Sequence, residues 1–181
     1  MIDKLVTESV DAYADEKLYP EEWDYEGLYK HLSQYFLTEE IMSSQDMEEY
    51  SRQELLERLL EIAHAEYQDR VDMLGDAMFG QLEKAIMLRV VDNKWMEHLD
   101  NMDMLREGIG LRAYGQKNPL VEYKFEAFDM FQNMIAAIQD ETIMALYKIR
   151  AQLIQEIEEP VDHLEGAQPH HEDVLEPQNI D

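Results

Sequence analysis

Apolar residues recur every three to four positions over most of this chain, which is the spacing of α-helices with one packed face. The pattern predicts a first helix over 1–18, ended by Pro20, whose ring cannot continue a helix. The segment "WDYEGLYKHLSQYFL", from Trp23 to Leu37, predicts a shorter helix with an aromatic face. No capping residue precedes the first helix, so we expect the chain to be cut from something longer.

A capping box marks the next helix, because Ser51 is followed three residues later by Glu54. The helix is expected to run to Leu74 and to end or kink at Gly75. Its apolar stripe consists of Leu55, Leu56, Leu59, Ile62, Ala63 and Tyr67.

Two longer patterns predict a pair of long helices. The stripe of the first, over 78–106, consists of Leu82, Ile86, Val90, Val91, Trp95, Leu99, Met102 and Leu105. The second is expected to begin at Pro119, which suits a first helical turn, and to end between 152 and 156. Its heptad seam consists of Phe128, Phe131, Ile135, Ile138, Thr142, Ala145 and Ile149, with Met130, Met134 and Met144 as filling side chains. Helices with complementary stripes and a short connection form an antiparallel αα-hairpin.

The connection, within "LREGIGLRAYGQKNPLVEY", differs from the rest of the chain. Gly108, Gly110 and Gly115 are expected to let the backbone turn sharply. Tyr114 has only small neighbours in sequence and is therefore unshielded. Binding residues tend to sit on loops that a rigid scaffold holds in place, so this tip is the candidate site.

Two interpretations of the tip side chains remain open from the loop alone. Tyr114 either contacts a partner or packs back on the hairpin. Arg112 and Lys117, which give the tip a local excess of positive charge, either bind a partner or are solvated. Met102 and Met104 lie nearer the tip than the other methionines and belong either to the seam or to the contact surface.

The 181 residues carry a formal net charge of −26 and contain no cysteine. This charge argues against binding to nucleic acid or anionic lipid and fits a partner with a basic face, such as the cytoplasmic loops of membrane proteins. The lack of cysteine excludes disulfides and thiolate metal sites. The early acidic residues argue against a signal peptide, and the apolar runs are shorter than a membrane span. We expect an acidic, cytoplasmic, helical protein.

The candidates for chemistry are weak. His98 beside Glu97 has no metal-ligand spacing, and the stripe of Glu97, Asp100 and Asp103 is more typical of a solvated helix face than of acid–base catalysis. The sequence has no GxxxxGK[ST] phosphate loop. We therefore predict no catalytic residue, no metal site and no cofactor for this chain.

The string "LRVVDNKWMEHLDNMDMLREGIGLRAYGQKNPLVEYKFEAFDMFQNMI" resembles the C-terminal helical region of the SecA family, the motor proteins of bacterial preprotein export. The resemblance is dense over 82–149 and looser over 1–76. It implies an all-α fold: the end of a scaffold helix over 1–19, a helical wing over 20–76, and a two-helix finger over 77–156 with its loop at 107–118. A disordered acidic tail is expected over 157–181.

The resemblance also implies a function. The finger of the family enters the cytoplasmic mouth of the SecYEG channel and contacts the unfolded preprotein, while ATP and Mg²⁺ bind motor domains that are absent here. The implied contact residues are Ile109, Leu111, Arg112, Tyr114, Gln116 and Lys117. The chain would then be a non-enzymatic part of a translocase, peripheral at the cytoplasmic face of the membrane. The alternative is a stand-alone helical adaptor that binds a protein partner without a motor.

The sequence departs from the family pattern in three respects. Glu107 stands where glutamine is common, and Gly110 where histidine is common. The cysteine-rich zinc tail that often ends the family is absent, as is the motor.

Overall fold

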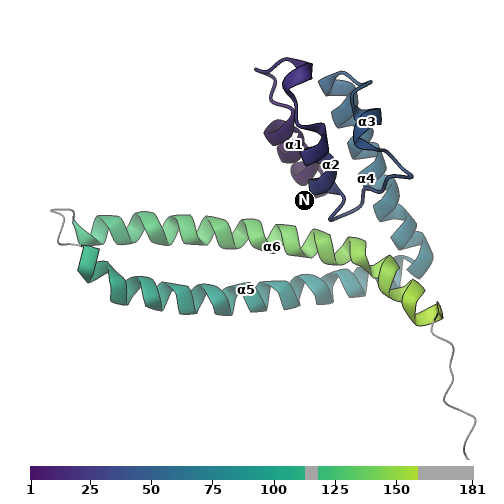
Figure 1. Ribbon diagram of the computed structural model, residues 1–181. Helices are drawn as coiled ribbons and strands as arrows, with labels where there is room; N and C mark the ends of the chain where they lie inside the picture. Colours follow the sequence, from purple (N-terminus) through teal and green to yellow (C-terminus); the bar gives the residue numbers. More distant parts are fainter. Residues whose placement is uncertain (113–117, 159–181) are drawn as a thin grey trace, which may run out of the picture. The chain divides into compact units, whose positions relative to one another are not determined.

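The computed structural model describes the backbone of residues 1–112 and 118–158, and the side chains of 1–109 and 118–149 (Figure 1). Over these ranges every regular element is a helix, which confirms the all-α fold class. The elements are α1 (Ile2–Tyr13), the 3₁₀ turn η1 (Pro20–Glu22), α2 (Tyr25–Leu32), α3 (Ser44–Met47), α4 (Arg52–Leu74), α5 (Asp76–Arg112) and α6 (Pro119–Glu158). The tail was predicted over 157–181; residues 157 and 158 instead belong to α6, and 159–181 lie outside the described residues.

The chain divides into two units, Met1–Arg150 and Ala151–Asp181. The described part of the second unit is the last stretch of α6, which therefore ends at Glu158, slightly beyond the predicted range. All contacts discussed below lie within the first unit.

Helices α1 to α4, hereafter the α1–α4 module, enclose an apolar core. Six side chains from three of its helices are fully buried: Val6, Val10, Leu28, Leu32, Leu55 and Leu59. Burying an aliphatic side chain of this size stabilises a fold by about 1.5–3 kcal/mol, so these residues hold the module together. The stripe predicted along α4 is confirmed, since Leu55, Leu59 and Ala63 are buried on it.

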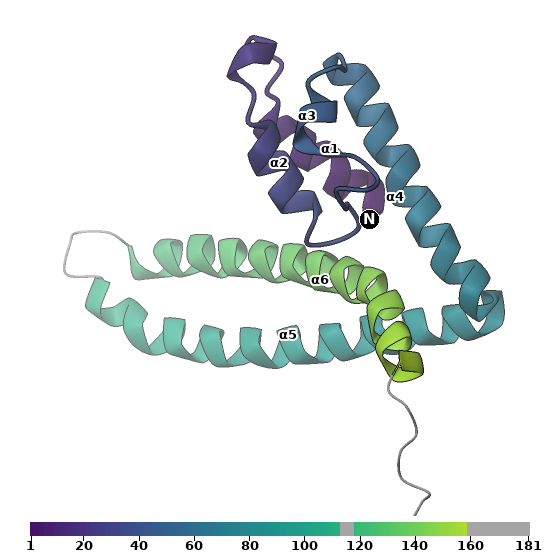
Figure 2. The same ribbon diagram turned by 45° about the vertical axis from the view of Figure 1, so that its right-hand side comes forward.

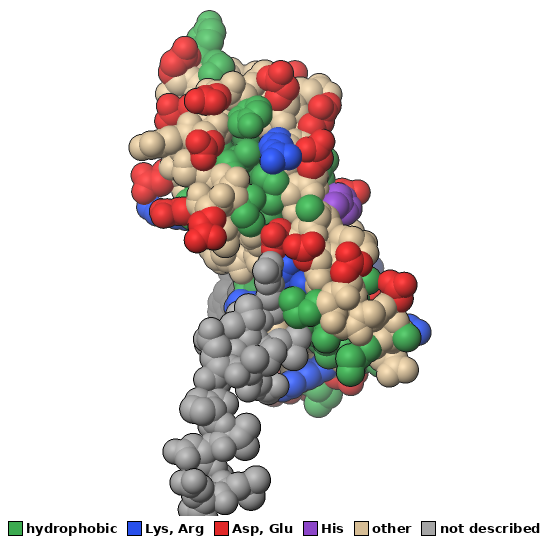
Figure 3. Space-filling model, turned by 90° about the vertical axis from the view of Figure 1, so that its right-hand side faces the viewer, with side chains coloured by type: hydrophobic (Ala, Val, Ile, Leu, Met, Phe, Trp, Pro, Cys, Tyr) green, Lys and Arg blue, Asp and Glu red, His purple; other side chains and the backbone are tan. Residues whose placement is uncertain are grey.

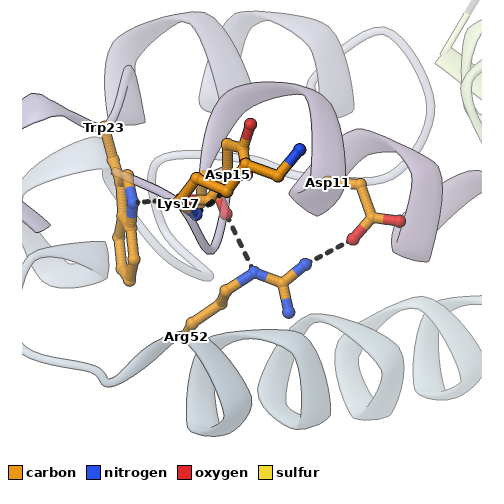
Figure 4. A network of polar contacts seen from close by, with 6 residues as sticks. Asp11, Asp15, Lys17, Trp23 and Arg52 are labelled. Carbon is orange, nitrogen blue, oxygen red and sulfur yellow. Dashed lines mark hydrogen bonds and ion pairs between the residues drawn. The ribbon is translucent and has the colours of Figure 1, made fainter. Parts of the chain in front are cut away.

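The first helix is shorter than the predicted 1–18: α1 ends at Tyr13. The chain leaves the helix at Ala14, whose carbonyl oxygen accepts a hydrogen bond of 2.9 Å from Arg52 Nε on α4. Arg52 also pairs with Asp11, and Trp23 Nε1 donates to the Asp15 carbonyl at 3.0 Å (Figure 4). Tertiary partners thus replace the hydrogen bonds that further helical turns would have made.

The second helix is also shorter than the predicted 23–37. Its start is fixed by the Asp24 carboxylate, which accepts a hydrogen bond of 2.8 Å from the Gly27 backbone N–H. It ends at Leu32, and the next residues turn inward so that Phe36 and Leu37 are buried in the core. Core burial therefore ends a helix that the local pattern would have continued.

Helix α4 begins as predicted. The Ser51 side chain accepts from the Glu54 backbone N–H, and the Glu54 carboxylate accepts from the Ser51 N–H at 3.0 Å, which is the expected capping box. The Ser51 hydroxyl also donates to Glu54 Oε2 at 2.6 Å, and this bond, followed by the one from the Ser51 N–H, lowers the pKa of Glu54. The helix ends as predicted at Gly75, which has a φ of 79°.

The antiparallel hairpin is confirmed. Helices α5 and α6 run side by side in opposite directions in both ribbon views (Figure 2). Lys94 of α5 pairs with Glu141 of α6, and the His98 ring lies 6.0 Å from the Phe131 ring across the hairpin.

Candidate functional site

The candidate site is the end of the hairpin, and α5 extends further into it than predicted. The helix continues through Gly108 and Gly110 to Arg112, so the expectation that these two glycines turn the chain is wrong. Glycine weakens a helix by about 1 kcal/mol relative to alanine, but packing along the hairpin overrides this preference. Leu105 is buried one turn earlier and Ile109 is half-buried, and these side chains keep the last turns of α5 packed toward α6.

The structure places three of the six predicted contact residues on the last turns of α5. Ile109 is half-buried, and Leu111 and Arg112 are the last helical residues, with side chains outside the described set. Tyr114, Gln116 and Lys117 lie outside the described residues. Whether the six side chains form one contact surface therefore stays a prediction.

Helix α6 starts at the predicted position. Pro119 is its first residue, and the Asn118 carboxamide oxygen accepts a hydrogen bond of 3.0 Å from the Leu120 backbone N–H. The Asn118 carbonyl accepts further bonds from Val121 and Glu122 at 3.0 and 3.1 Å. Proline lacks the N–H that would be unsatisfied in a first turn, so the sequence "NP" fixes where the return helix begins.

The residues along the seam of the hairpin are in part those predicted: Ile138, Thr142 and Ile149 of α6 and Val91, Met102 and Leu105 of α5 are confirmed. On α6 the buried positions of the seam are Met134, Ile138, Thr142 and Ile149. On α5 the inward positions are the half-buried Val91, Lys94, His98 and Met102, followed by the buried Leu105. The seam thus includes three polar side chains, Lys94, His98 and Thr142, and Met134 packs in it as predicted.

Five large apolar side chains assigned to the packed stripes are exposed instead. Trp95 is 46% exposed, so its interpretation as a core residue is wrong. The others are Leu99 at 43%, Phe128 at 61%, Phe131 at 40% and Ile135 at 36%. These five residues are hereafter called the aromatic face.

Both helices contribute to the aromatic face across the seam. The His98 ring centroid lies 5.8 Å from that of Trp95 on its own helix and 6.0 Å from that of Phe131 on α6. The sequence does contain a signal for this exposed face, because α6 carries two apolar stripes. Met130, Met134 and Ile138 form one stripe, and Phe128, Phe131 and Ile135 form the second. One partner helix buries only one of two adjacent stripes.

A groove of about 280 Å³ lies along the seam. It is lined by Lys94, Glu97, His98, Asn101, Met130, Asn133, Met134 and Ala137. Lys94 Nζ bridges Glu97 at 3.4 Å and Glu141, and its hydrogen bond to Glu141 raises the pKa of Lys94. Glu97 and Trp95 are two residues apart and so point about 160° apart on the helix, and His98 lies between the groove and the aromatic face.

The acidic stripe of α5 is occupied by surface ion pairs. Glu97 pairs with Lys94, and Asp103 pairs with Arg106 at 3.0 Å. All four side chains are solvent-accessible, which is typical of a solvated helix face. In the described part of the chain, no group of three His, Asp or Glu side chains is placed to hold a metal ion. Over the same part, no helix is long and apolar enough to cross a membrane.

The described residues therefore form a helical scaffold rather than a catalytic pocket. It consists of a small packed module and a long hairpin that leads to the candidate binding tip. Residues 1–150 match the family model of the SecA wing and scaffold domain. The chain belongs to this family.

Three relatives illustrate the similarity. The chain is 51% identical over 149 residues to the protein translocase subunit SecA of Pelotomaculum thermopropionicum, and 48% over 158 residues to that of Desulforudis audaxviator. It is 42% identical over 174 residues to that of Desulforamulus reducens. These alignments cover 82%, 83% and 93% of this chain but only 17%, 17% and 20% of the relatives. The chain thus spans about a fifth of the length of the relatives it matches.

Proposed function

We propose that this chain is the scaffold, wing and finger part of a protein translocase, and that it couples an ATP-driven motor to the movement of secretory preproteins through the SecYEG channel. The observation that carries the proposal is the hairpin, whose helices of 37 and 40 residues present the tip sequence "LRAYGQKNP" at their far end. A stiff pair of helices can transmit a displacement made at its base to a residue at its tip. Family membership supports this reading, because the relatives are named translocase subunits.

In this proposal the tip makes contact with the unfolded polypeptide. Ile109, Leu111, Arg112, Tyr114, Gln116 and Lys117 form the contact surface. Preproteins differ in sequence, so the contact has to be tolerant of sequence. A tyrosine with small neighbours suits this role, because it offers apolar area and a hydroxyl group at low entropic cost.

The α1–α4 module would supply the docking surface. Residues 1–75 contain twenty acidic and six basic residues, and carboxylates are spread over the face of the module in Figure 3. An acidic surface is complementary to the basic cytoplasmic face of a membrane channel. In this arrangement the protein is peripheral at the cytoplasmic side of the membrane, and ATP and Mg²⁺ bind the motor domains of the full-length protein.

The test is a site-specific photo-crosslink. The motor domains of a relative are joined upstream of residue 1, a photoreactive amino acid replaces Tyr114, and a secretory chain is stalled in reconstituted SecYEG. We expect crosslinks to the stalled chain that change with the stall position. A matched probe at Met87, which is 45% exposed on α5 far from the tip, should give none.

Two results would contradict the proposal. Crosslinks from position 114 only to the hairpin itself would mean that Tyr114 packs inward. Tight binding of a protein partner by the motor-free chain, with no change in translocation when the tip is mutated, would instead favour the stand-alone adaptor.

Binding to the channel should also weaken steeply as salt is raised, if the acidic module docks through charge.

A further inference from the structure

Helices α4, α5 and α6 meet at one junction. The single residue that links α4 to α5 does not by itself fix the angle between these two helices. Gly75 alone separates the end of α4 from the start of α5. Its φ of 79° is a conformation that residues with a Cβ rarely adopt, and no atom lies within 4 Å of the place where a Cβ would be. The direction of the hairpin is therefore set by side-chain contacts, which include Ile143 and Tyr147 of α6 buried in the core of the module.

One tie joins α4 to the start of α5. The rings of Tyr67 and Phe79 meet edge to face, with centroids 5.2 Å apart and an interplanar angle of 89°. The Tyr67 hydroxyl donates to Glu83 Oε1 at 3.3 Å, and Phe79 is buried with only 2% exposure. This tie holds the first two turns of α5 against α4.

The second tie joins α4 to α6 and centres on Arg70, a buried arginine with 6% exposure. Arg70 Nε donates to the Tyr147 carbonyl oxygen at 3.0 Å, and the guanidinium lies 5.0 Å from the centroid of the Tyr147 ring. The Tyr147 hydroxyl in turn donates to the Ala63 carbonyl of α4 at 2.7 Å. Each helix therefore donates to a backbone carbonyl of the other.

The charge of Arg70 is balanced within α4. Glu66 Oε2 lies 3.0 Å from Arg70 Nη1, and both side chains are largely buried. A buried charge is stable only when it is paired and hydrogen-bonded, so Arg70 depends on α6 as well as on Glu66. Leu or Met would fill the same space without this dependence, which makes a purely space-filling role a poor explanation for an arginine here.

Two further polar contacts join the module to α6. Lys4 Nζ donates to Gln139 at 3.2 Å on the surface, and the hydroxyl of the buried Tyr35 donates to Asp140 at the edge of the core. The Lys4 contact is solvated and contributes little to a fixed geometry, and the Tyr35 contact is a single hydrogen bond. The Arg70 tie is thus the buried, multiply bonded contact closest to the Gly75 link.

We propose that the junction is an elbow in which Gly75 is the hinge and the Arg70–Tyr147 contact is the lock that fixes the direction of the α5–α6 hairpin relative to the α1–α4 module. Releasing the lock lets the hairpin swing while both parts stay folded. The device goes beyond the function proposed above, because it belongs to the isolated chain and needs neither channel nor motor.

The absence of cysteine makes a distance measurement direct. Glu49→Cys on the module and Met104→Cys on the hairpin, both exposed, carry spin labels, and pulsed electron paramagnetic resonance gives the distribution of distances between them. We expect one narrow distribution in the parent and a clearly broader or second distribution in Arg70→Met. The matched control is Arg58→Met, an exposed arginine on the same helix that pairs with Glu61 at 3.0 Å, and it should keep the parent distribution.

An unchanged distribution in folded Arg70→Met would overturn the proposal. If that variant loses its helical far-ultraviolet signal, Arg70→Lys decides, because lysine keeps a charge beside Glu66 but lacks the fork that also reaches the Tyr147 carbonyl. Broadening in folded Arg70→Lys supports the elbow, and the parent distribution in that variant refutes it. Broadening of equal size in Arg58→Met would also refute it, since the effect would then be general loosening.

Discussion

The α1–α4 module and the α5–α6 hairpin are both made of amphipathic helices, but they bury their apolar faces to different extents. In the module, Val6, Leu28 and Leu59 are fully buried in a shared core. In the hairpin, Trp95 and Phe128 remain 46% and 61% exposed. The module, together with Ile143 and Tyr147 of α6, buries several stripes in one core, whereas the part of the hairpin beyond that contact buries one stripe per helix. The module therefore carries more of its own stability, and the hairpin keeps apolar surface that its own folding does not use.

The largest expected effect is a cavity in the module. Leu59→Ala should destabilise the chain by about 3 kcal/mol, because it removes a fully buried side chain from a packed core. Leu99→Ala, the same substitution on the aromatic face, should cost less than about 1 kcal/mol. Urea unfolding followed by far-ultraviolet circular dichroism compares the two, and equal losses would mean that Leu99 is buried in solution.

A pair of neighbouring substitutions sharpens the comparison within the hairpin. Met134→Ala should cost about 2 kcal/mol, because Met134 is 8% exposed in the seam. Ile135→Ala, one residue on, should cost less than about 1 kcal/mol, because Ile135 belongs to the exposed face. Equilibrium unfolding of both variants measures the difference. The reverse order would show that the heptad seam first predicted from the sequence is the packed one.

Alkaline pH tests the contact between the two regions. Burial raises the pKa of Tyr147 above its usual value, and the nearby Arg70 opposes this only in part. Since the folded pKa is raised, the stabilisation is complete below pH 10 and is lost as pH rises above it, by about 1 kcal/mol at pH 11. Tyr147→Phe should flatten that decline in urea midpoints between pH 9 and 11. Tyr50→Phe is the control, and an equal slope in Tyr147→Phe would contradict the prediction.

The smallest expected effects come from the helix caps. Asp24→Ala removes the cap of α2 inside the module and should cost about 1 kcal/mol. Asn118→Ala removes the cap of α6 at the exposed end of the hairpin and should cost about 0.5 kcal/mol. Thermal unfolding of the two variants, with Asp24→Asn and Asn118→Asp as cap-retaining controls, measures both. A larger loss at Asn118 would mean that the hairpin end is as cooperative as the module.

Much of the fold could be predicted because its signals are local. The Ser51–Glu54 capping box, the end of α4 at Gly75 and the start of α6 at Pro119 each depend on residues close in sequence. The site was predicted less completely. Of its six residues, the structure describes the side chain of Ile109 and the backbone of Leu111 and Arg112. The residues of the aromatic face were predicted to be packed between the helices, but they are exposed.

The sequence by itself determined that this chain is all-helical, where most of its helices begin, and that two long helices form a hairpin. It also determined the family, through the string that covers the hairpin and its tip. The tertiary structure decided which stripe of each long helix is buried, that α1 stops at Tyr13, that α5 continues through Gly108, and that Arg70 is buried against Tyr147. The physical reason is that helical periodicity fixes the spacing of apolar residues but not the rotation at which a helix meets its partner. That rotation, and the hydrogen bonds that end a helix early, depend on residues distant in sequence.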